Sequence, residues 1–211
     1  RGELTGSTAA IDAVVELIGN NEPTHVLVAF LNQTEIRPGG GFIGSYGDIT
    51  FTRGSITNID IRDIYDPDGQ LDQKLIPPEP LQTITKDWEA RDANWFFDYP
   101  TSAKLFTRFL EESKIYSEKN IRFKGVIAVN TTVVADLMRL VGPIELPEYK
   151  LTITPENLLG EVQREVESGA DKKVNKPKRI LTILAPKILH EVTTFDDAEK
   201  EAFIRLLSEH A

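Results

Sequence analysis

The sequence lacks cysteine, and methionine occurs only once, at Met138 in the interior of the chain. Without cysteine the chain can form no disulfide bond, no thiolate metal site and no cysteine nucleophile. Because the sequence begins at Arg1 and its one methionine is internal, we expect it to be a fragment of a longer protein. Long apolar runs are missing as well: no window reaches the roughly 18 apolar residues of a membrane-spanning helix.

Positive charge is scarce, with 24 Lys and Arg against 33 Asp and Glu and a formal net charge of -9. A chain of this charge is repelled on average by nucleic acids and by anionic membrane surfaces, so we expect neither as a direct partner. Histidine is rare too, and His25, His190 and His210 lie far apart. Their spacing predicts neither a zinc site nor a histidine-based catalytic triad.

The residues that are present suffice for one sizeable core, because the chain has 211 residues and 40% of them are hydrophobic. Apolar, β-branched runs at residues 25–32 and 123–130 are typical of strands buried on both faces. Residues 42–63 have the pattern of a hairpin that turns at Arg53-Gly54. Residues 64–82, rich in proline and aspartate, predict a long surface loop, which in a compact domain is often functional.

Helical spacing of apolar residues predicts several helices between these strands. The first lies between Ser7 and Gly19, another begins at Pro100, a third covers residues 131–141 and a fourth opens at Thr154-Pro155-Glu156. We also expect a short helix around Trp88, a small hairpin after Gly142-Pro143, and two final helices around Pro186 and Phe195-Asp196, the last at residues 196–211. The pattern predicts an α/β fold: one domain over residues 1–211, with a mixed central β-sheet, helices on both faces in α/β/α layers, a small added hairpin and C-terminal helices.

Two loops carry the least ordinary chemistry. In the first, EIRPGGGF, the glycines match G-x-G-x-x-G but a strand follows instead of a helix, which argues against a dinucleotide site. Backbone N–H groups at Gly40 and Gly41 could still form a nest for phosphate beside Arg37, and the alternative is a glycine-rich turn with a surface arginine. The second loop, WEARDANWFFDYP, crowds four aromatic residues before Pro100, which favours packing against the core over a ligand groove.

Arginine stands next to aspartate twice, at Arg62-Asp63 on a strand end and at Arg91-Asp92 in the second loop. Such a pair can be an ion pair that pins a loop, worth about 1 kcal/mol or less when exposed. Alternatively, the arginines clamp phosphate oxygens while Asp63, Asp92 or Asp98 holds Mg²⁺ through carboxylate oxygens. The sequence leaves both interpretations open.

Three strings, FLNQTEIRPGGGFIGSYGDI, WEARDANWFFDYPTSAKLF and FKGVIAVNTTVVADLMRLVGPIELP, closely resemble the bacterial domain-of-unknown-function family 4012 over most of residues 24–190. The middle motif, Arg91 to Trp95 followed by Asp98 and Pro100, is the most specific. Members of that family look like envelope proteins with an N-terminal membrane anchor. The resemblance therefore implies an extracytoplasmic domain held to the membrane by a segment outside this sequence.

A more distant similarity is to the LytR-CpsA-Psr family, which transfers polyprenyl-pyrophosphate-linked glycopolymers to the cell wall. Arg37, then Arg62-Asp63, then the strand and helix that lead to Gly142-Pro143 occur in a similar order, and Arg179 lies near where that family has further pyrophosphate-binding arginines. The metal-binding aspartate that follows the first arginine in that family has no counterpart, because Gly39 to Gly41 stand there. Magnesium would then require Asp63 or Asp92.

These similarities imply a domain that binds a phosphate- or pyrophosphate-containing glycolipid or glycopolymer and, if it is an enzyme, transfers it in a phosphotransferase-like reaction. A carboxylate would hold Mg²⁺ or deprotonate the acceptor hydroxyl. The expected ligand-binding residues are Arg37, Gly40, Gly41, Arg62, Arg91, Asn94 and Arg179, and Asp63 and Asp92 are the expected catalytic and metal-binding residues. The alternative is a non-catalytic envelope scaffold in which the same arginines are structural.

Overall fold

The computed structural model describes residues 21–169, 171 and 178–209, so the helix expected between Ser7 and Gly19 lies outside the described residues. The chain divides into two compact units, with the boundary between Ala128 and Val129. No helix within the described ranges is long and apolar enough to cross a membrane. The expectation that residues 1–211 form a single domain stays a prediction, and the two units are taken in turn below.

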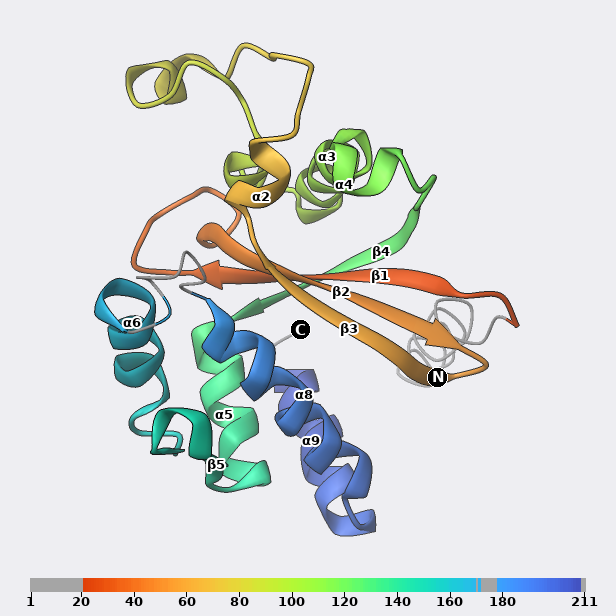
Figure 1. Ribbon diagram of the computed structural model, residues 1–211, viewed down its shortest axis with the longest axis vertical. Helices are drawn as coiled ribbons and strands as arrows, with labels where there is room; N and C mark the ends of the chain where they lie inside the picture. The colour runs from red at the N-terminus through yellow and green to blue at the C-terminus, as the bar shows by residue number, and fades with distance from the viewer. Residues whose placement is uncertain (1–20, 170, 172–177, 210–211) are drawn as a thin grey trace, which may run out of the picture. The chain divides into compact units, whose positions relative to one another are not determined.

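The first unit is built on a four-stranded sheet of order β3-β2-β1-β4. Its strands are β1 (Thr24–Asn32), β2 (Phe42–Thr52), β3 (Ser55–Asp63) and β4 (Phe123–Asn130). The first three are antiparallel neighbours, whereas β4 runs in the same direction as β1 (Figure 1). The sheet is therefore mixed, as the sequence predicts.

The turn of the β2–β3 hairpin lies at Arg53 and Gly54, which both have positive φ angles. Two consecutive residues with positive φ are the geometry of a tight type I′ turn, which matches the twist of the flanking strands. The hairpin predicted for residues 42–63 is confirmed.

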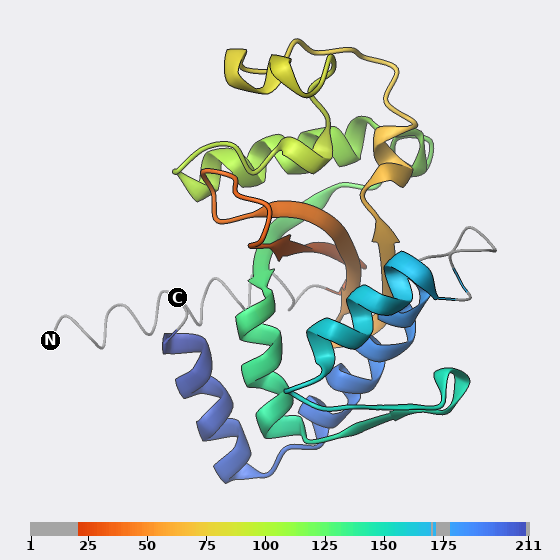
Figure 2. The same ribbon diagram turned by 90° about the vertical axis from the view of Figure 1, so that its left-hand side faces the viewer.

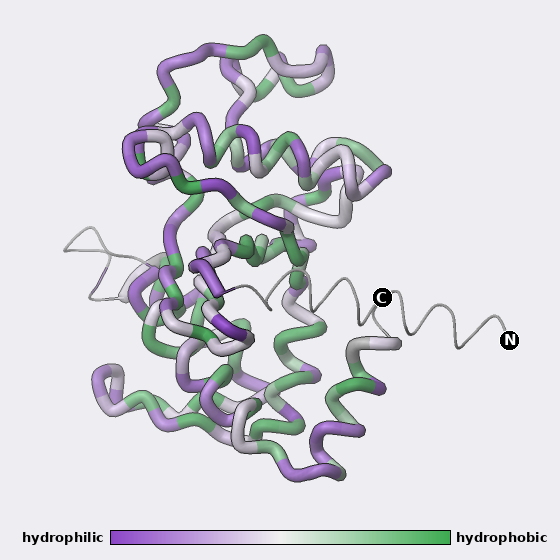
Figure 3. Tube along the Cα trace, turned by 90° about the vertical axis from the view of Figure 1, so that its right-hand side faces the viewer, coloured by the Kyte–Doolittle hydropathy of each residue, from purple (hydrophilic) through white to green (hydrophobic). Residues whose placement is uncertain are grey.

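Helices cover one face of this sheet (Figure 2). They are α2 (Tyr65–Asp68), α3 (Tyr99–Glu112) and α4 (Lys114–Ser117), with 3-10 turns at η1 (Glu79–Thr83) and η2 (Ala90–Asp92). The buried residues Leu27, Ala29 and Tyr46 of the sheet form one core with Phe106 and Phe109 of α3. Figure 3 shows hydrophobic and hydrophilic residues alternating along α3, as an amphipathic helix requires.

The predicted start of α3 is confirmed. Pro100 occupies the first turn, where its missing N–H costs nothing, and the Asp98 side chain accepts a hydrogen bond from the Thr101 N–H at 3.0 Å. Asp98 is thus the N-cap of this helix. The short helix expected around Trp88 is wrong: Trp88 forms an isolated antiparallel bridge with Leu75, and its backbone N–H donates to the Leu75 carbonyl at 2.8 Å.

In its described residues, the second unit consists of the end of β4, helices and one small hairpin. It contains α5 (Thr131–Val141), β5 (Ile144–Leu146), η3 (Pro147–Tyr149), β6 (Leu151–Ile153), α6 (Leu158–Ser168), α8 (Arg179–Thr194) and α9 (Asp197–Glu209). Met138, Leu146, Ile153, Ile180 and Leu184 lie in its core. The hairpin and the C-terminal helices are confirmed. Helix α8 continues through Pro186, and packing on both sides of the proline stabilises it, because Leu184 and Ile188 are both buried. The helix ends at Thr194.

Candidate functional site

The loop of residues 33–41 connects β1 to β2. Two of its glycines have positive φ angles, which other residues rarely adopt. Gly40 and Gly41 have φ angles of 100° and 144°. A Cβ atom at Gly41 would lie 2.7 Å from the Asn32 carbonyl oxygen. Only glycine therefore allows the backbone at position 41 to lie this close to the backbone of Asn32. The Gly40 N–H donates to the Arg37 carbonyl at 3.0 Å, and this N–H is therefore used within the loop.

Asn94 joins this loop to the second motif. Its side-chain Nδ2 donates to the Gly39 carbonyl at 2.8 Å and to the Gly41 carbonyl at 2.9 Å, and the Gly39 N–H donates to the Asn94 carbonyl at 3.2 Å. A Cβ atom at Gly39 would lie 2.1 Å from Asn94 Oδ1. Because Asn94 is buried and held by these bonds, it could not move aside. The two segments interlock.

Arg37 and Asp92 form a second link between the same two segments. Arg37 Nε and Nη2 both lie 2.9 Å from Asp92 Oδ1, and Arg37 Nη1 donates to the Ile36 carbonyl at 3.0 Å. The guanidinium also stacks over the Phe42 ring, 5.1 Å from its centroid. Asp92 is only 2% exposed. A carboxylate buried to this extent requires a charged partner, and Arg37 supplies it.

Arg91 connects Asp92 to α2. Its Nε lies 3.5 Å from Asp92 Oδ2, its Nη1 donates to Asp68 Oδ2 at 3.0 Å and also pairs with Glu89, and its Nη2 donates to Thr85 Oγ1 at 3.2 Å. The buried Asp68 accepts a further bond at its Oδ1 from the Ala90 N–H, at 2.8 Å. We call the connected side chains the loop network, which consists of Arg37, Asp68, Glu89, Arg91, Asp92 and Asn94.

Burial perturbs the ionisation of this network. It raises the pKa of Asp68 to about 7, because removing the carboxylate from water outweighs the opposing effect of Arg91. Burial alone would lower the pKa of Arg91, but the carboxylates of Glu89, Asp68 and Asp92 together raise it. The guanidinium therefore stays charged, whereas the raised pKa of Asp68 lies near neutral pH.

Arg62 and Asp63 do not form the ion pair that their adjacency suggests. Consecutive strand residues point to opposite faces of a sheet, so the side chains of Arg62 and Asp63 point away from each other. In the register of β2 and β3, Arg62 is paired with Tyr46 and Asp63 with Ser45. Arg62 Nε donates instead to Asp60 Oδ2 at 2.7 Å, and Asp63 Oδ1 accepts from the Tyr65 N–H at 3.1 Å. The ion-pair interpretation is therefore wrong for Arg62-Asp63, whereas Arg91 and Asp92 do form an ion pair.

Arg179 belongs to the second unit, where it begins α8. Its Nη1 lies 3.4 Å from Asp171 Oδ1, and the Tyr149 hydroxyl donates to the other oxygen of Asp171. The arginine side chain is half-exposed. Arg179 is thus tied into its own unit by an acidic partner. Of the expected ligand-binding residues, Arg37, Arg91, Asn94 and the glycine run are brought together.

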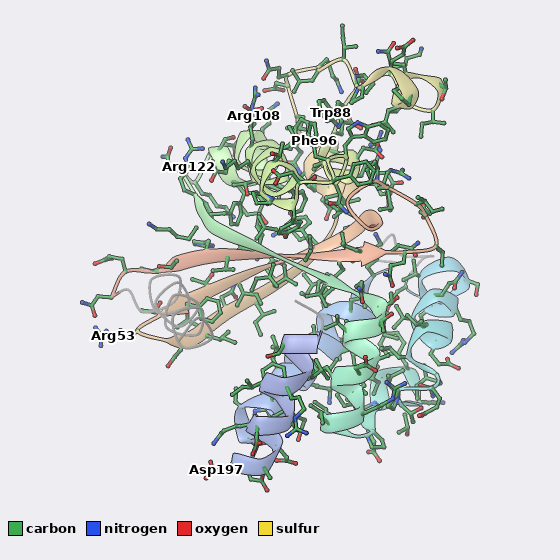
Figure 4. All side chains as sticks on the ribbon, turned by 180° about the vertical axis from the view of Figure 1, so that it is seen from behind. Arg53, Trp88, Phe96, Arg108, Arg122 and Asp197 are labelled. Carbon is green, nitrogen blue, oxygen red and sulfur yellow. The ribbon has the colours of Figure 1, made fainter. Side chains whose placement is uncertain are left out.

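The aromatic loop before α3 is divided between packing and exposure. Phe96 packs on Trp88, with 6.1 Å between ring centroids (Figure 4), and the Tyr99 hydroxyl donates to the Val126 carbonyl at 3.1 Å. Phe97 points away from the protein and is 90% exposed. The predicted core role holds for Phe96 and Tyr99 but is wrong for Phe97.

The sequence interpretation missed a polar cluster on the helix-covered face of the sheet. His25 Nδ1 lies 2.8 Å from Oδ1 of the buried Asp48, and the Tyr116 hydroxyl donates to the Tyr46 hydroxyl at 3.0 Å. Burial raises the pKa of Asp48 and of both tyrosines. Arg62 lies beside the tyrosines and not in the loop network. The only signal in the sequence was alternation: His25, Tyr46, Asp48 and Arg62 fall on the same face once strand register is known.

No cluster of three or more His, Cys, Asp or Glu that could hold a metal ion occurs among the residues that the structure describes. Within the loop network the two oxygens of Asp92 already face Arg37 and Arg91, and Asp63 lies outside the network. Magnesium at Asp63 or Asp92 stays a prediction.

Comparison with known proteins gives a family and no activity. No curated protein matches the chain. A family model described as "Protein of unknown function (DUF4012)" matches residues 21–166, which include the whole loop network and exclude Arg179. Because the match covers more than half of the sequence, the chain belongs to the DUF4012 family.

Proposed function

We propose that this domain is a non-catalytic interaction module of the cell envelope, in which the loop network is a structural clasp. The observation that carries the proposal is that every nitrogen of the Arg37 and Arg91 guanidinium groups already has a partner within the protein. These partners include two buried carboxylates, Asp68 and Asp92. This pairing supports the alternative interpretation of the sequence, in which the arginines are structural.

The charge balance of the network supports the same conclusion. Two arginines face three carboxylates, those of Asp68, Glu89 and Asp92, so the network has no surplus positive charge to attract a phosphate. A phosphate that displaced Asp92 from Arg37 would leave a buried carboxylate without its main partner. Breaking a buried pair in this way typically costs about 3–5 kcal/mol.

The second candidate is a domain that binds a phosphate- or pyrophosphate-containing glycolipid or glycopolymer, with or without transfer. It is favoured by the convergence of Arg37 and Arg91, from segments 54 positions apart in sequence (37 and 91), on the single carboxylate of Asp92. In that proposal the ligand would bind to the exposed edges of the two guanidinium groups; the side chains of Arg37 and Arg91 are 14% and 20% exposed. An extracytoplasmic location and a membrane anchor outside this sequence belong to both proposals.

Thermal melting with ligand separates the two candidates. If the loop network is a structural clasp, we expect the melting midpoint to stay the same when inorganic pyrophosphate or a polyprenyl pyrophosphate is added, each with Mg²⁺. The clasp also predicts that Arg37→Ala lowers the free energy of unfolding by about 3 kcal/mol, because Asp92 loses its principal partner. The matched control is Arg62→Ala, whose half-exposed pair with Asp60 should cost about 1 kcal/mol or less.

The opposite result would favour the second candidate. A ligand present at a hundredfold excess over its dissociation constant stabilises a protein by about 2.7 kcal/mol. A stabilisation of that size that persists in Arg62→Ala but disappears in Arg37→Ala and Arg91→Ala would overturn the clasp and assign phosphate binding to the loop network.

A further inference from the structure

A groove of about 350 Å³ lies between α3 and β4 in the first unit. Its walls carry four basic residues: Lys104 and Arg108 on α3, and Arg122 and Lys124 at the start of β4. Residues four apart on a helix share a face, and residues two apart along an extended chain share a side, so the two members of each pair lie on the same side of their element and line the groove together. Arg108 and Arg122 lie at the same end of the unit in Figure 4.

The groove is electropositive in a protein that is otherwise acidic. Two carboxylates, Glu111 and Glu112, also line it, so its net formal charge is 4 − 2 = +2, against −9 for the whole chain. Glu111 binds Arg122 Nη1 at 2.7 Å, and Glu112 binds Arg108 Nε at 2.7 Å. Within the described part of the chain, no ion pair involves the exposed Lys104 or Lys124. The surplus positive charge therefore belongs to these two lysines.

Among the strands that the structure describes, the one that forms a wall of the groove, β4, lies at an edge of the sheet, because it follows β1 as the last in the order. The floor includes the half-buried Gly125 and Val126, and glycine in a strand allows another backbone to approach closely. A groove between a helix and an edge strand fits an extended chain better than a globular surface.

We infer that this groove binds an extended acidic peptide segment of a partner protein, with two of its carboxylates on Lys104 and Lys124. This inference rests on the proposed function as an interaction module and names its surface. A peptide suits the groove better than a phosphate polymer does, because a peptide can place its carboxylates only on Lys104 and Lys124. A polymer with a charge on every unit would also bring phosphates against Glu111 and Glu112, whose carboxylates already bind Arg122, the Phe123 N–H and Arg108. The average charge of the chain also opposes the approach of a long polyanion.

The test is fluorescence anisotropy of a labelled octapeptide of alternating glutamate and serine with the full chain. We expect the peptide to bind with an affinity that falls as salt rises. The double variant Lys104→Glu with Lys124→Glu should bind the peptide about tenfold more weakly or worse. The matched control reverses two exposed lysines outside the groove, Lys86→Glu with Lys200→Glu, and should change affinity less than twofold. Circular dichroism checks that both double variants fold.

Three results would overturn the inference: no binding by the wild-type chain, equal loss of binding in both double variants, or tighter binding of an inorganic polyphosphate of the same charge than of the peptide. The last result would assign the groove to a phosphate polymer. Since Arg37 and Arg91 do not line the groove, a pyrophosphate response that depends on them would contradict the clasp without affecting this test.

Discussion

Asn94 joins the two loops through its side-chain amide, which donates to the carbonyls of both Gly39 and Gly41. Asn94→Ala removes the hydrogen-bond donor of both carbonyls at a buried position, so the two carbonyl oxygens lose their partner. We expect the free energy of unfolding to fall by about 2 kcal/mol in chemical denaturation. Asn58→Ala is the control, since Asn58 is exposed on β3, and its effect should stay within about 0.5 kcal/mol. Equal effects would contradict the role given to Asn94.

Asp68 makes stability depend on pH in an unusual direction for a carboxylate. Its pKa is raised from 3.8 to about 7 in the folded protein, so between these values the folded state holds a proton that the unfolded state releases. Its contribution to stability is complete below pH 4 and is lost as pH rises through 7, at a rate of at most about 1.4 kcal/mol per pH unit. Asp68→Asn cannot titrate.

Melting curves recorded from pH 4 to 8 should therefore show a smaller fall in stability with rising pH for Asp68→Asn than for the wild type. Asp72→Asn provides the control, because Asp72 is an exposed carboxylate whose partner is Lys114 on the surface. Wild type and Asp68→Asn with identical pH dependence would show that the ion pair with Arg91 keeps Asp68 at an ordinary pKa.

The tip of the β2–β3 hairpin holds a non-glycine residue in a strained backbone conformation, because Arg53 has a φ of 53° (Figure 4). Non-glycine residues pay about 1 kcal/mol in this region, and asparagine is better tolerated there. Arg53→Asn creates the Asn-Gly sequence preferred in type I′ turns, so we expect a gain of about 0.5–1 kcal/mol in thermal melting. Arg53→Val, which is β-branched, should destabilise instead. A gain in both variants would mean that loss of the arginine charge, not the turn, is responsible.

Elements defined by local pattern were predictable from the sequence. Strand β4 and helix α5 occupy the predicted residues 123–130 and 131–141, since Asn130 caps the helix and Gly142 ends it with a φ of 82°. The helix expected around Trp88 fails for a physical reason: the backbone of Trp88 is paired with Leu75, which lies 13 residues away (75 to 88), and no local periodicity reports such pairing.

The candidate site was predictable only in part, because the expected residues Arg62, Asp63 and Arg179 lie outside the loop network. Arg37, Arg91, Asp92 and Asn94 were expected to act together, and they do lie together. Asp68, the buried acidic partner of Arg91, however, comes from the short helix α2 after β3, where its sequence context is that of a solvated turn. Whether an arginine is free to bind phosphate depends on such distant partners, and a single sequence does not contain that information.

At the scale of the whole molecule, the average charge conceals a local reversal. The value of −9 argues against polyanionic partners, yet the groove between α3 and β4 has a net charge of +2. In sequence Glu111 and Glu112 stand between its two basic pairs, and the four basic residues gather only because the helix and the strand line one groove. Composition therefore excludes classes of partner for the average surface but not for one groove.

The interlocking of Gly39 with Asn94 has a consequence for how this sequence can change over generations. The two residues lie 55 positions apart, and any side chain at position 39 occupies the space of the Asn94 amide. A mutation at either position alone is therefore damaging, and one that shortens residue 94 opens room for a methyl group at 39 only at the loss of two hydrogen bonds. Selection should preserve the two positions as a pair, and relatives that depart from one should depart from both.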